Sequence, residues 1–178
     1  MQKPTRIAVL AAIAIALIAT LGTSWTSAST PETPPPGTFV IGTVGASWQI
    51  DPGLAYITSA WELEYATCAK LLNYPDKPAA EGAKLVPEAA SGMPSISNDG
   101  KTYAFTIAKG FRFSPPSNQP VTAQTFKFVL ERDLNPKLSS PAAQFVRDIV
   151  GAQAMSRGKA AHLSGVTVSG DKLTIRLT

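Results

Sequence analysis

Two regions of the chain alternate apolar and polar residues, which is the pattern of half-buried β-strands. Each region has a turn-forming sequence between two such stretches: Asn98-Asp99-Gly100 separates 95–97 from 102–108, and Ser169-Gly170-Asp171 separates 166–168 from 172–177. The alternating apolar positions are Tyr103, Phe105 and Ile107 in the first region and Val166, Val168, Leu173, Ile175 and Leu177 in the second. The pattern predicts two β-hairpins, one in the middle and one at the end of the chain.

Three other stretches repeat apolar residues at intervals of three and four, the spacing of one face of an α-helix. The first begins at Ser59, where Glu62 follows three residues later as in a capping box. The second begins at Thr122 and runs to about Leu134, and the third begins at Ser140-Pro141. The residues that we expect to face the core are Trp61, Tyr65, Cys68 and Leu72 in the first helix, Ala123, Phe126, Val129, Leu130 and Leu134 in the second, and Ala142, Phe145, Val146, Ile149 and Ala152 in the third.

Because helical and strand patterns are both present, the chain is expected to have an α+β fold. Residues 38–44 are a further strand candidate, and they are followed by breakers at Gly45 and in the Asp51-Pro52-Gly53 turn. The last strand pattern reaches Thr178 with no polar tail, so we expect the chain to be the amino-terminal portion of something longer. The same pattern predicts an exposed apolar strand edge at 173–177, and with it marginal stability or association.

The first 28 residues have the composition of an export signal. Lys3 and Arg6 precede the apolar run 7–21, and small residues lead up to Ala28, after which we expect cleavage. The apolar run would rise about 22 Å as a helix, short of the roughly 30 Å hydrocarbon core of a membrane. An uncleaved membrane anchor is the alternative, and with either the rest of the chain is exported. Residues 29–37 contain three consecutive prolines and are expected to form an extended linker.

The composition limits the partners that the chain can bind. Apolar residues make up 44% of the 178 residues, which is compatible with a packed core, and a single cysteine, Cys68, excludes an intrachain disulfide. The 16 basic and 12 acidic residues become 14 and 12 once Lys3 and Arg6 of the leader are set aside, and the remaining basic residues are scattered. This distribution does not support nucleic-acid binding.

The sequence contains no catalytic signature. His162 is the single histidine, so the common multi-histidine zinc site cannot form, and a surface or packed histidine is the favoured interpretation. Neither a Gly-x-Ser-x-Gly elbow nor a Gly-rich nucleotide pattern occurs. We therefore expect no enzyme, no metal and no cofactor, and binding becomes the leading class of function. Trp48, in the loop after the first strand candidate, is either a lid over the core or a platform for a ligand, and the residues alone favour the core.

Several segments, in their order along the chain, resemble the amino-terminal region of family 5 extracellular solute-binding proteins, the oligopeptide- and dipeptide-binding receptors of ABC importers. The most telling are DGKTYAFTIAKGFRF at 99–113 and PVTAQTFKFVLER at 120–132. The other segments that carry the resemblance are 39–55, 61–74, 85–107, 140–160 and 163–178. One departure is Ala108, where the family usually has Arg or Lys before the Lys-Gly pair.

This resemblance implies the amino-terminal portion of a two-lobed periplasmic-binding-protein-like fold of type II, with an extra subdomain and incomplete here. Residues 38–178 would be the solute-binding domain. Within it, 38–55 and 166–178 would belong to the first lobe, and 56–165 would form an additional α+β subdomain. The carboxy-terminal lobe and much of the binding cleft would be missing.

The function implied by the resemblance is that of an extracytoplasmic substrate-binding component of an ABC transporter. It would capture a peptide or related small solute by lobe closure and pass it to a permease in the membrane. Ala46, Ser47 and Trp48 match the loop that contacts the peptide backbone in peptide-binding members, and backbone recognition accepts varied side chains. The acidic residue that usually holds the peptide's amino terminus lies outside this sequence. The alternative is an exported sensor or adhesion module with no importer, anchored by an uncleaved leader.

Overall fold

The computed structural model describes residues 33–40 and 49–178, and the chain divides into two units, Met1–Gly42 and Thr43–Thr178. In the first unit, the N–H of Thr38 donates to the carbonyl of Pro35 at 3.1 Å and closes a turn. Phe39 and Val40 are exposed and form no strand, so the strand expected at 38–44 is not found among its described residues. The leader, with the expected cleavage after Ala28, lies outside the described residues.

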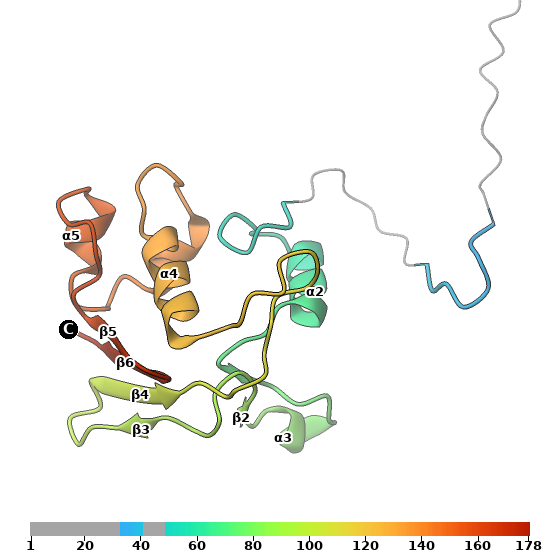
Figure 1. The fold of residues 1–178 in the computed structure, drawn as a ribbon, viewed down its shortest axis with the longest axis horizontal. Coiled ribbons are helices and arrows are strands. Elements are labelled where there is room, and N and C mark those ends of the chain that lie inside the picture. The colour runs from blue at the N-terminus through green and yellow to red at the C-terminus, as the bar shows by residue number, and fades with distance from the viewer. Residues whose placement is uncertain (1–32, 41–48) are drawn as a thin grey trace, which may run out of the picture. The chain divides into compact units, whose positions relative to one another are not determined.

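The described elements of the second unit are short helices and short strands (Figure 1). In chain order they are α2 (Thr58–Thr67), β1 (Leu72–Asn73), α3 (Ala79–Gly82), β2 (Val86–Pro87), β3 (Ser95–Ile96), β4 (Thr102–Thr106), α4 (Ala123–Asp133), the 3-10 helix η1 (Pro141–Phe145), α5 (Ala152–Ser156), β5 (Val166–Ser169) and β6 (Lys172–Arg176). The fold is therefore mixed α/β, as the sequence predicts.

A four-stranded antiparallel sheet organises this unit, with the strand order β3-β4-β6-β5. Both hairpins predicted from the sequence are confirmed, and the register places Phe105 opposite Leu173 and Leu173 opposite Val168. Because alternate residues share a face, this register gathers the apolar residues of three strands on one side of the sheet. Gly100 and Gly170, in the two hairpin turns, have positive φ angles of 70° and 57°, which glycine adopts without steric cost.

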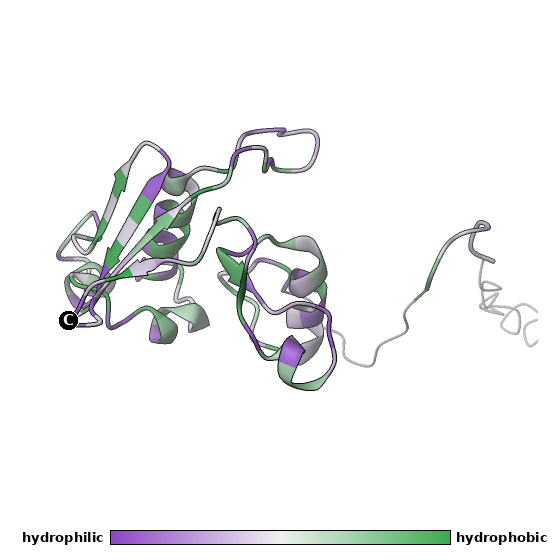
Figure 2. Cartoon of the chain, turned by 90° about the horizontal axis from the view of Figure 1, so that it is seen from below, coloured by the Kyte–Doolittle hydropathy of each residue, from purple (hydrophilic) through white to green (hydrophobic). Residues whose placement is uncertain are grey.

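The apolar side of the sheet is covered by α4 and α5 (Figures 1 and 2). Ala123 and Leu134, at the two ends of α4, are buried together with Met155 of α5 against Phe105 and Leu173 of the sheet. The helix predicted from Thr122 is thus confirmed, and the Oγ1 of Thr125 accepts a hydrogen bond from the Thr122 N–H at 3.0 Å, as in a capping box. Val129, expected in the core, is 43% exposed.

The first predicted helix differs from its expectation in both its start and its orientation. α2 begins one residue before Ser59, its N-cap is Ile57, and no side chain caps it, so the predicted capping box is not formed. The helix ends at Thr67, so Cys68 is its C-cap and Leu72 lies in a strand beyond it. Trp61 and Tyr65 of the expected core stripe are 45% and 49% exposed, and Ala60 is the buried residue of the helix.

The third predicted helix is broken into two pieces. Ser140 caps it as expected, since its Oγ accepts a hydrogen bond from the Ala142 N–H at 3.1 Å, but the turn that follows is the 3-10 helix η1. η1 ends at Phe145, and α5 begins only after Gly151, whose φ of 89° no right-handed helix can contain. Phe145, expected to face the core, is 69% exposed.

The last strand is central in the sheet and not at its edge. β6 pairs with β4 along its whole length and with β5 on its other side, so the exposed strand edge expected at 173–177 is not formed. The outer strands of the sheet are β3 and β5. The expected division at 165/166 assigns β4 to the additional subdomain and β6 to the first lobe, although the two strands share one sheet. The division into lobes stays a prediction.

Among the residues that the structure describes, no helix is both long enough and apolar enough to cross a membrane.

Candidate functional site

The residues that the sequence proposes for ligand contact, Ala46, Ser47 and Trp48, lie outside the described residues. The structure describes the same loop from Gln49 onwards, where it enters the turn at Asp51. The site can therefore be built from the point at which this loop joins the rest of the second unit.

The turn after the loop is closed by backbone and side-chain hydrogen bonds to Asp51. Its carbonyl accepts from the N–H groups of Leu54 at 2.8 Å and Ala55 at 2.9 Å, and its Oδ1 accepts from the N–H of Gly53 at 3.0 Å. This arrangement explains the Asp-Pro-Gly sequence, because Asp bonds the backbone two residues ahead and Gly leaves room for a close approach. The end of the loop is thus fixed to a rigid turn.

Arg132, on the last turn of α4, holds this turn from the other side. Its Nη1 and Nη2 donate to Oδ1 and Oδ2 of Asp51 at 2.7 and 2.5 Å, a two-pronged pair that matches the planar guanidinium to the carboxylate. A Cβ placed on Gly53 would lie 2.5 Å from the Arg132 Nη1 and 3.0 Å from the Oδ1 of Asp133. Gly53 therefore allows α4 and the turn to approach closely.

The ion pair and the burial around it shift the pKa values of the nearby carboxyl groups in opposite directions. The hydrogen bond from Arg132 holds the pKa of Asp51 below its ordinary value, and that pair raises the pKa of Arg132 in turn. Burial raises the pKa of Asp133, which is only 8% exposed and lies 3.5 Å from the Ser140 hydroxyl. Burial also raises the pKa of Glu64, with the negative charge of Asp51 as the next cause. Asp51 and Asp133 thus lie beside one guanidinium, and Glu64 lies close enough to Asp51 to respond to its charge.

Aromatic side chains follow the turn along the chain. The indole Nε1–H of Trp61 donates to the carbonyl of Ala55 at 3.2 Å, so α2 is attached to the turn through this ring. Tyr56 packs edge-on against Trp61, with ring centres 5.3 Å apart, and lies 6.4 Å from Phe145 of η1. The Nε2 of Gln144 donates to the hydroxyl of Tyr56 at 3.0 Å.

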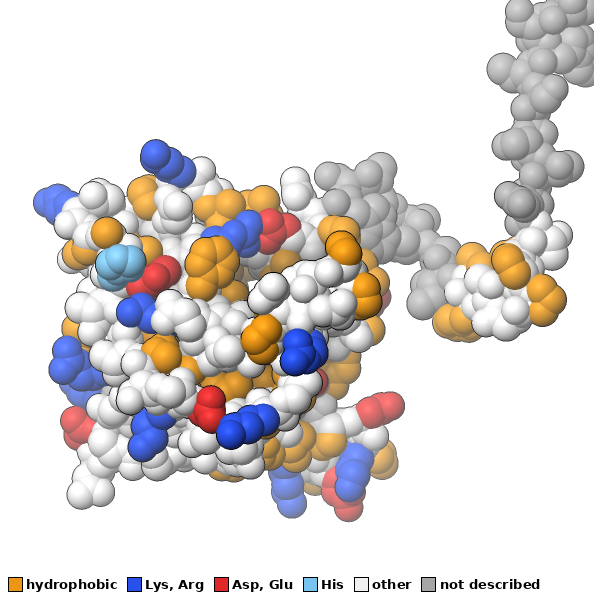
Figure 3. Space-filling model, in the orientation of Figure 1, with side chains coloured by type: hydrophobic (Ala, Val, Ile, Leu, Met, Phe, Trp, Pro, Cys, Tyr) orange, Lys and Arg blue, Asp and Glu red, His pale blue; other side chains and the backbone are white. Residues whose placement is uncertain are grey.

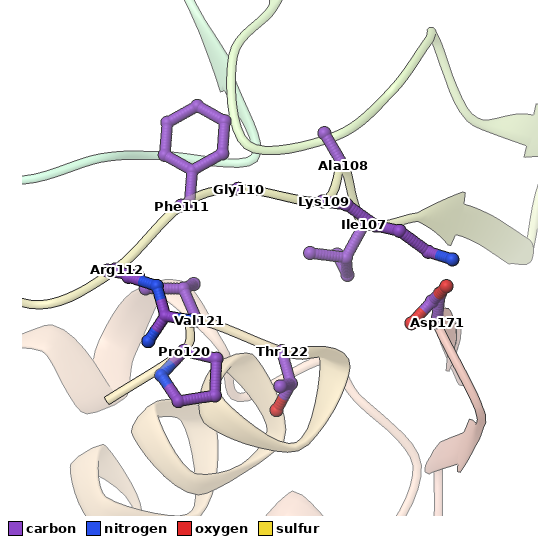
Figure 4. Close-up of a pocket in the computed structure, with 10 residues that line it drawn as sticks. All are labelled: Ile107, Ala108, Lys109, Gly110, Phe111, Arg112, Pro120, Val121, Thr122 and Asp171. Carbon is purple, nitrogen blue, oxygen red and sulfur yellow. The ribbon is translucent and has the colours of Figure 1, made fainter. Parts of the chain in front are cut away.

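A shallow depression of about 200 Å³ lies beside the start of α4, between residues 107–112 and 120–122, with Asp171 at its rim (Figure 4). Lys109 and Arg112 are its cationic side chains, and Arg112 is engaged, since its Nη1 donates to the carbonyl of Asn118 at 2.8 Å. The lining contains no pairing of a nucleophile with a base. The depression therefore offers no catalytic arrangement.

The remaining candidates for chemistry lie apart from one another. Cys68 is free and half-buried at the end of α2, and His162 is exposed, with its Nδ1 3.4 Å from the Glu131 Oε1. Across residues 33–40 and 49–178, no group of three His, Cys, Asp or Glu side chains is placed to hold a metal ion. Basic and acidic side chains are interspersed on the face shown in Figure 3, which agrees with their scattered positions in the sequence.

The pair of Asp51 and Arg132 is the feature that sequence reasoning missed. The two residues are 81 positions apart, and neither the Asp-Pro-Gly turn nor the helix pattern indicates a partner for the other. In the sequence, Arg132 is recognisable only as a charged residue within a helical pattern. Many surface residues of helices are charged, so this property does not indicate an ion pair.

Comparison with known proteins places the chain among solute-binding proteins. The family model for the middle region of bacterial extracellular solute-binding proteins, family 5, matches residues 84–178. The oligopeptide-binding protein OppA of Bacillus subtilis (strain 168) is 41% identical over 75 residues, covering 40% of this chain and 13% of that protein. The dipeptide-binding protein DppE of the same organism is 32% identical over 84 residues, covering 47% of this chain and 15% of that protein.

Solved structures support the same assignment. Peptide-bound OppA of Listeria monocytogenes matches 72% of this chain with a TM-score of 0.64 at 18% identity, which shows the fold alone. The murein tripeptide-binding protein MppA of Escherichia coli matches 72% with a TM-score of 0.61 at 31% identity. The chain spans about 24% of each of these two structures and 13–15% of the two Bacillus subtilis relatives, so it corresponds to a portion of their fold. Because the family model matches more than half of its residues, the chain belongs to the bacterial extracellular solute-binding proteins of family 5.

Proposed function

We propose that this chain belongs to the extracytoplasmic substrate-binding component of an ABC transporter, and that the receptor captures peptides for import. The observation that carries the proposal is the family match over residues 84–178, together with relatives whose names are those of oligopeptide- and dipeptide-binding proteins. The chain would contribute one portion of a two-lobed receptor that closes around its ligand and then delivers it to a membrane permease.

Within this receptor, Ala46, Ser47 and Trp48 would contact the backbone of the bound peptide. A receptor that accepts varied side chains must recognise the groups that all peptides share, and extended backbone does so through its N–H and C=O groups. The turn held by Asp51 and Arg132 supports this assignment, because it provides a fixed end for the loop that carries the three residues.

The alternative of an exported sensor or adhesion module is not favoured, because the relatives found are solute-binding proteins. The reading frame beyond codon 178 tests the choice directly. A continuation into a second α/β lobe, beside genes for a permease and an ATPase, is expected for a transport receptor. A kinase or other signalling domain after codon 178 would contradict it.

The ligand class is tested by calorimetric titration of trialanine into the product of the complete reading frame. We expect binding with the unmodified protein and at least about fivefold weaker binding after Trp48→Ala, the loss that corresponds to about 1 kcal/mol for removal of a contacting aromatic ring. Phe128→Ala is the matched control, because Phe128 is 60% exposed on α4. If the two variants lose the same affinity, Trp48 has no specific role in binding, whereas no binding of trialanine by the unmodified protein would contradict the peptide assignment.

A further inference from the structure

Two residues that the sequence pattern assigns to the core are exposed on the same surface of the second unit. Helical spacing places Trp61 in the core through the first predicted helix and Phe145 through the third, yet 45% and 69% of their surface is exposed. They lie on different elements, α2 and η1, and Tyr56 connects them. Its ring centre is 5.3 Å from that of Trp61 and 6.4 Å from that of Phe145. Tyr56, Trp61 and Phe145 thus form one aromatic cluster.

The polar atoms of the aromatic cluster already have hydrogen-bond partners within the chain. The Nε1–H of Trp61 donates to the carbonyl of Ala55 at 3.2 Å, and the hydroxyl of Tyr56 accepts from the Nε2 of Gln144 at 3.0 Å. Covering a polar atom that lacks such a partner costs free energy, and here that cost does not arise. The surface is therefore suited to contact with an apolar partner.

The position of the aromatic cluster along the chain indicates which partner this is. Tyr56 directly follows residues 38–55, the segment that the family resemblance assigns to the first lobe. The chain spans about 24% of each matched receptor, so most of the polypeptide that completes this lobe lies outside it. Single exposed apolar side chains need no partner, but contiguous ones mark an interaction surface. The cluster thus lies where the rest of the first lobe would adjoin the chain.

We propose that an apolar segment of the receptor's own polypeptide, beyond Thr178, packs on the aromatic cluster. This inference rests on the proposed two-lobed receptor. A segment of the same chain is favoured over a second copy, because covalent connection holds it near the cluster at a high effective concentration. Under this packing, Trp61 and Phe145 are buried in the complete receptor, although they are exposed in the described structure.

The test is photo-crosslinking in the product of the complete reading frame, with p-benzoylphenylalanine in place of Phe145. Peptide mass spectrometry is expected to map intramolecular cross-links from position 145 to apolar residues after 178. Thr58 provides a second position, because it lies beside Trp61 and its replacement leaves all three rings in place. Position 81 is the control, since the Glu81 side chain is 70% exposed and pairs with Lys77, and it should give no cross-link to residues after 178.

Cross-links only within residues 1–178, cross-links between two copies, or no cross-links from positions 58 and 145 would overturn the proposal. The readout needs no ligand, so it is separable from the receptor function. Trialanine binding without these cross-links would reject the packing alone, whereas the cross-links without trialanine binding would reject the peptide function and leave the packing in place.

The apolar character of the partner is tested by a charge at position 145. A carboxylate covered by an apolar segment would lack hydrogen-bond partners, so Phe145→Asp is expected to lower the Tm of the complete product by about 4 °C or more. Phe145→Leu keeps an apolar contact and should lower the Tm by less than half as much. Equal Tm values for Phe145→Asp and the unmodified protein would show that position 145 faces water, and would contradict the packing.

Discussion

The ion pair of Asp51 and Arg132 is expected to stabilise the fold, and Arg147 provides a control arginine for measuring this effect. Both side chains of the Asp51 pair are about one-third exposed and the pair is two-pronged, whereas Arg147 lies 3.9 Å from Asp148 with both side chains more than three-quarters exposed. We expect Arg132→Met to lower the free energy of unfolding by about 1 kcal/mol and Arg147→Met to change it by less than about 0.5 kcal/mol. Urea unfolding followed by circular dichroism gives both values, and similar losses in the two variants would contradict the importance of the Asp51 contact.

The two carboxyl groups beside Arg132 should respond to pH with opposite sign. The pKa of Asp51 is lowered from 3.8 in the folded protein, so its pair contributes stability above that pH and loses it as the pH falls through the lowered value. The pKa of Asp133 is raised by burial, so the protonated form favours folding at low pH and that contribution is lost as the pH rises through the raised value.

It follows that Asp51→Asn should cost more stability at pH 7 than at about pH 2.5. Relative to the unmodified protein, Asp133→Asn should be more favourable at pH 7 than at the lower pH. Urea titrations of the three proteins at the two pH values measure these differences. If Asp51→Asn and Asp133→Asn showed the same pH dependence of stability, the pKa values of Asp51 and Asp133 would not be shifted in opposite directions.

At the scale of single residues, the sequence predicts turns better than it predicts which side chains contact each other. The Asp51-Pro52-Gly53 breaker is visible in the sequence because each residue has a local backbone preference. Arg132 reaches Asp51 only because α4 packs beside the turn, which is a tertiary relation that local spacing does not encode. Of the ligand-contact residues proposed from the family resemblance, all three lie outside the described chain, so that portion of the site stays a prediction.

Elements whose pattern and packing agree are predicted correctly. The two hairpins have strict alternation and a glycine in each turn, and α4 has both a capping threonine and an apolar face that covers a sheet. The helix at α2 is predicted correctly, but its predicted buried face is wrong: the aromatic residues have helical spacing, whereas the core contact is made by the small Ala60. The prediction for the third helix is wrong because the apolar period continues through Gly151, where the backbone turns left-handed. Periodicity therefore locates these elements but cannot decide which face is buried.

Close backbone contacts at Gly165, just before the last hairpin, predict that adding one methyl group there lowers the stability of the protein. A Cβ on Gly165 would lie 2.6 Å from the Val150 carbonyl oxygen and 2.8 Å from the Arg176 carbonyl oxygen, and backbone atoms in a sheet cannot move aside easily. We expect Gly165→Ala to cost about 1–3 kcal/mol, the range for overpacking a tight site. Gly92→Ala, where a Cβ meets nothing within 4 Å, should be neutral or slightly stabilising. Thermal unfolding compares the two, and equal melting temperatures would contradict the packing at Gly165.

At the scale of the molecule, the position of β6 changes the expectation drawn from the sequence. A strand that ends near the last residue looks like an open edge in the sequence, but β4 and β5 flank it on both sides and Leu173 is fully buried. The backbone groups of β6 are thereby bonded within the sheet, so association through this strand is not expected. Strand order is set by long-range pairing, which alternation along one strand cannot reveal.

Because the chain spans about 24% of the matched receptors, its ability to bind peptide alone is the sharpest test of the two-lobed proposal. One portion of a clamp leaves its ligand in contact with water on the open side, and neither closure nor desolvation then adds to affinity. We expect calorimetry with trialanine to detect no submicromolar binding to a Ser29–Thr178 chain, under conditions in which the complete product binds. Urea unfolding of the same preparation controls for folding. Submicromolar binding by the folded chain would show that its own surface forms a complete site, and the requirement for a second lobe would have to be abandoned.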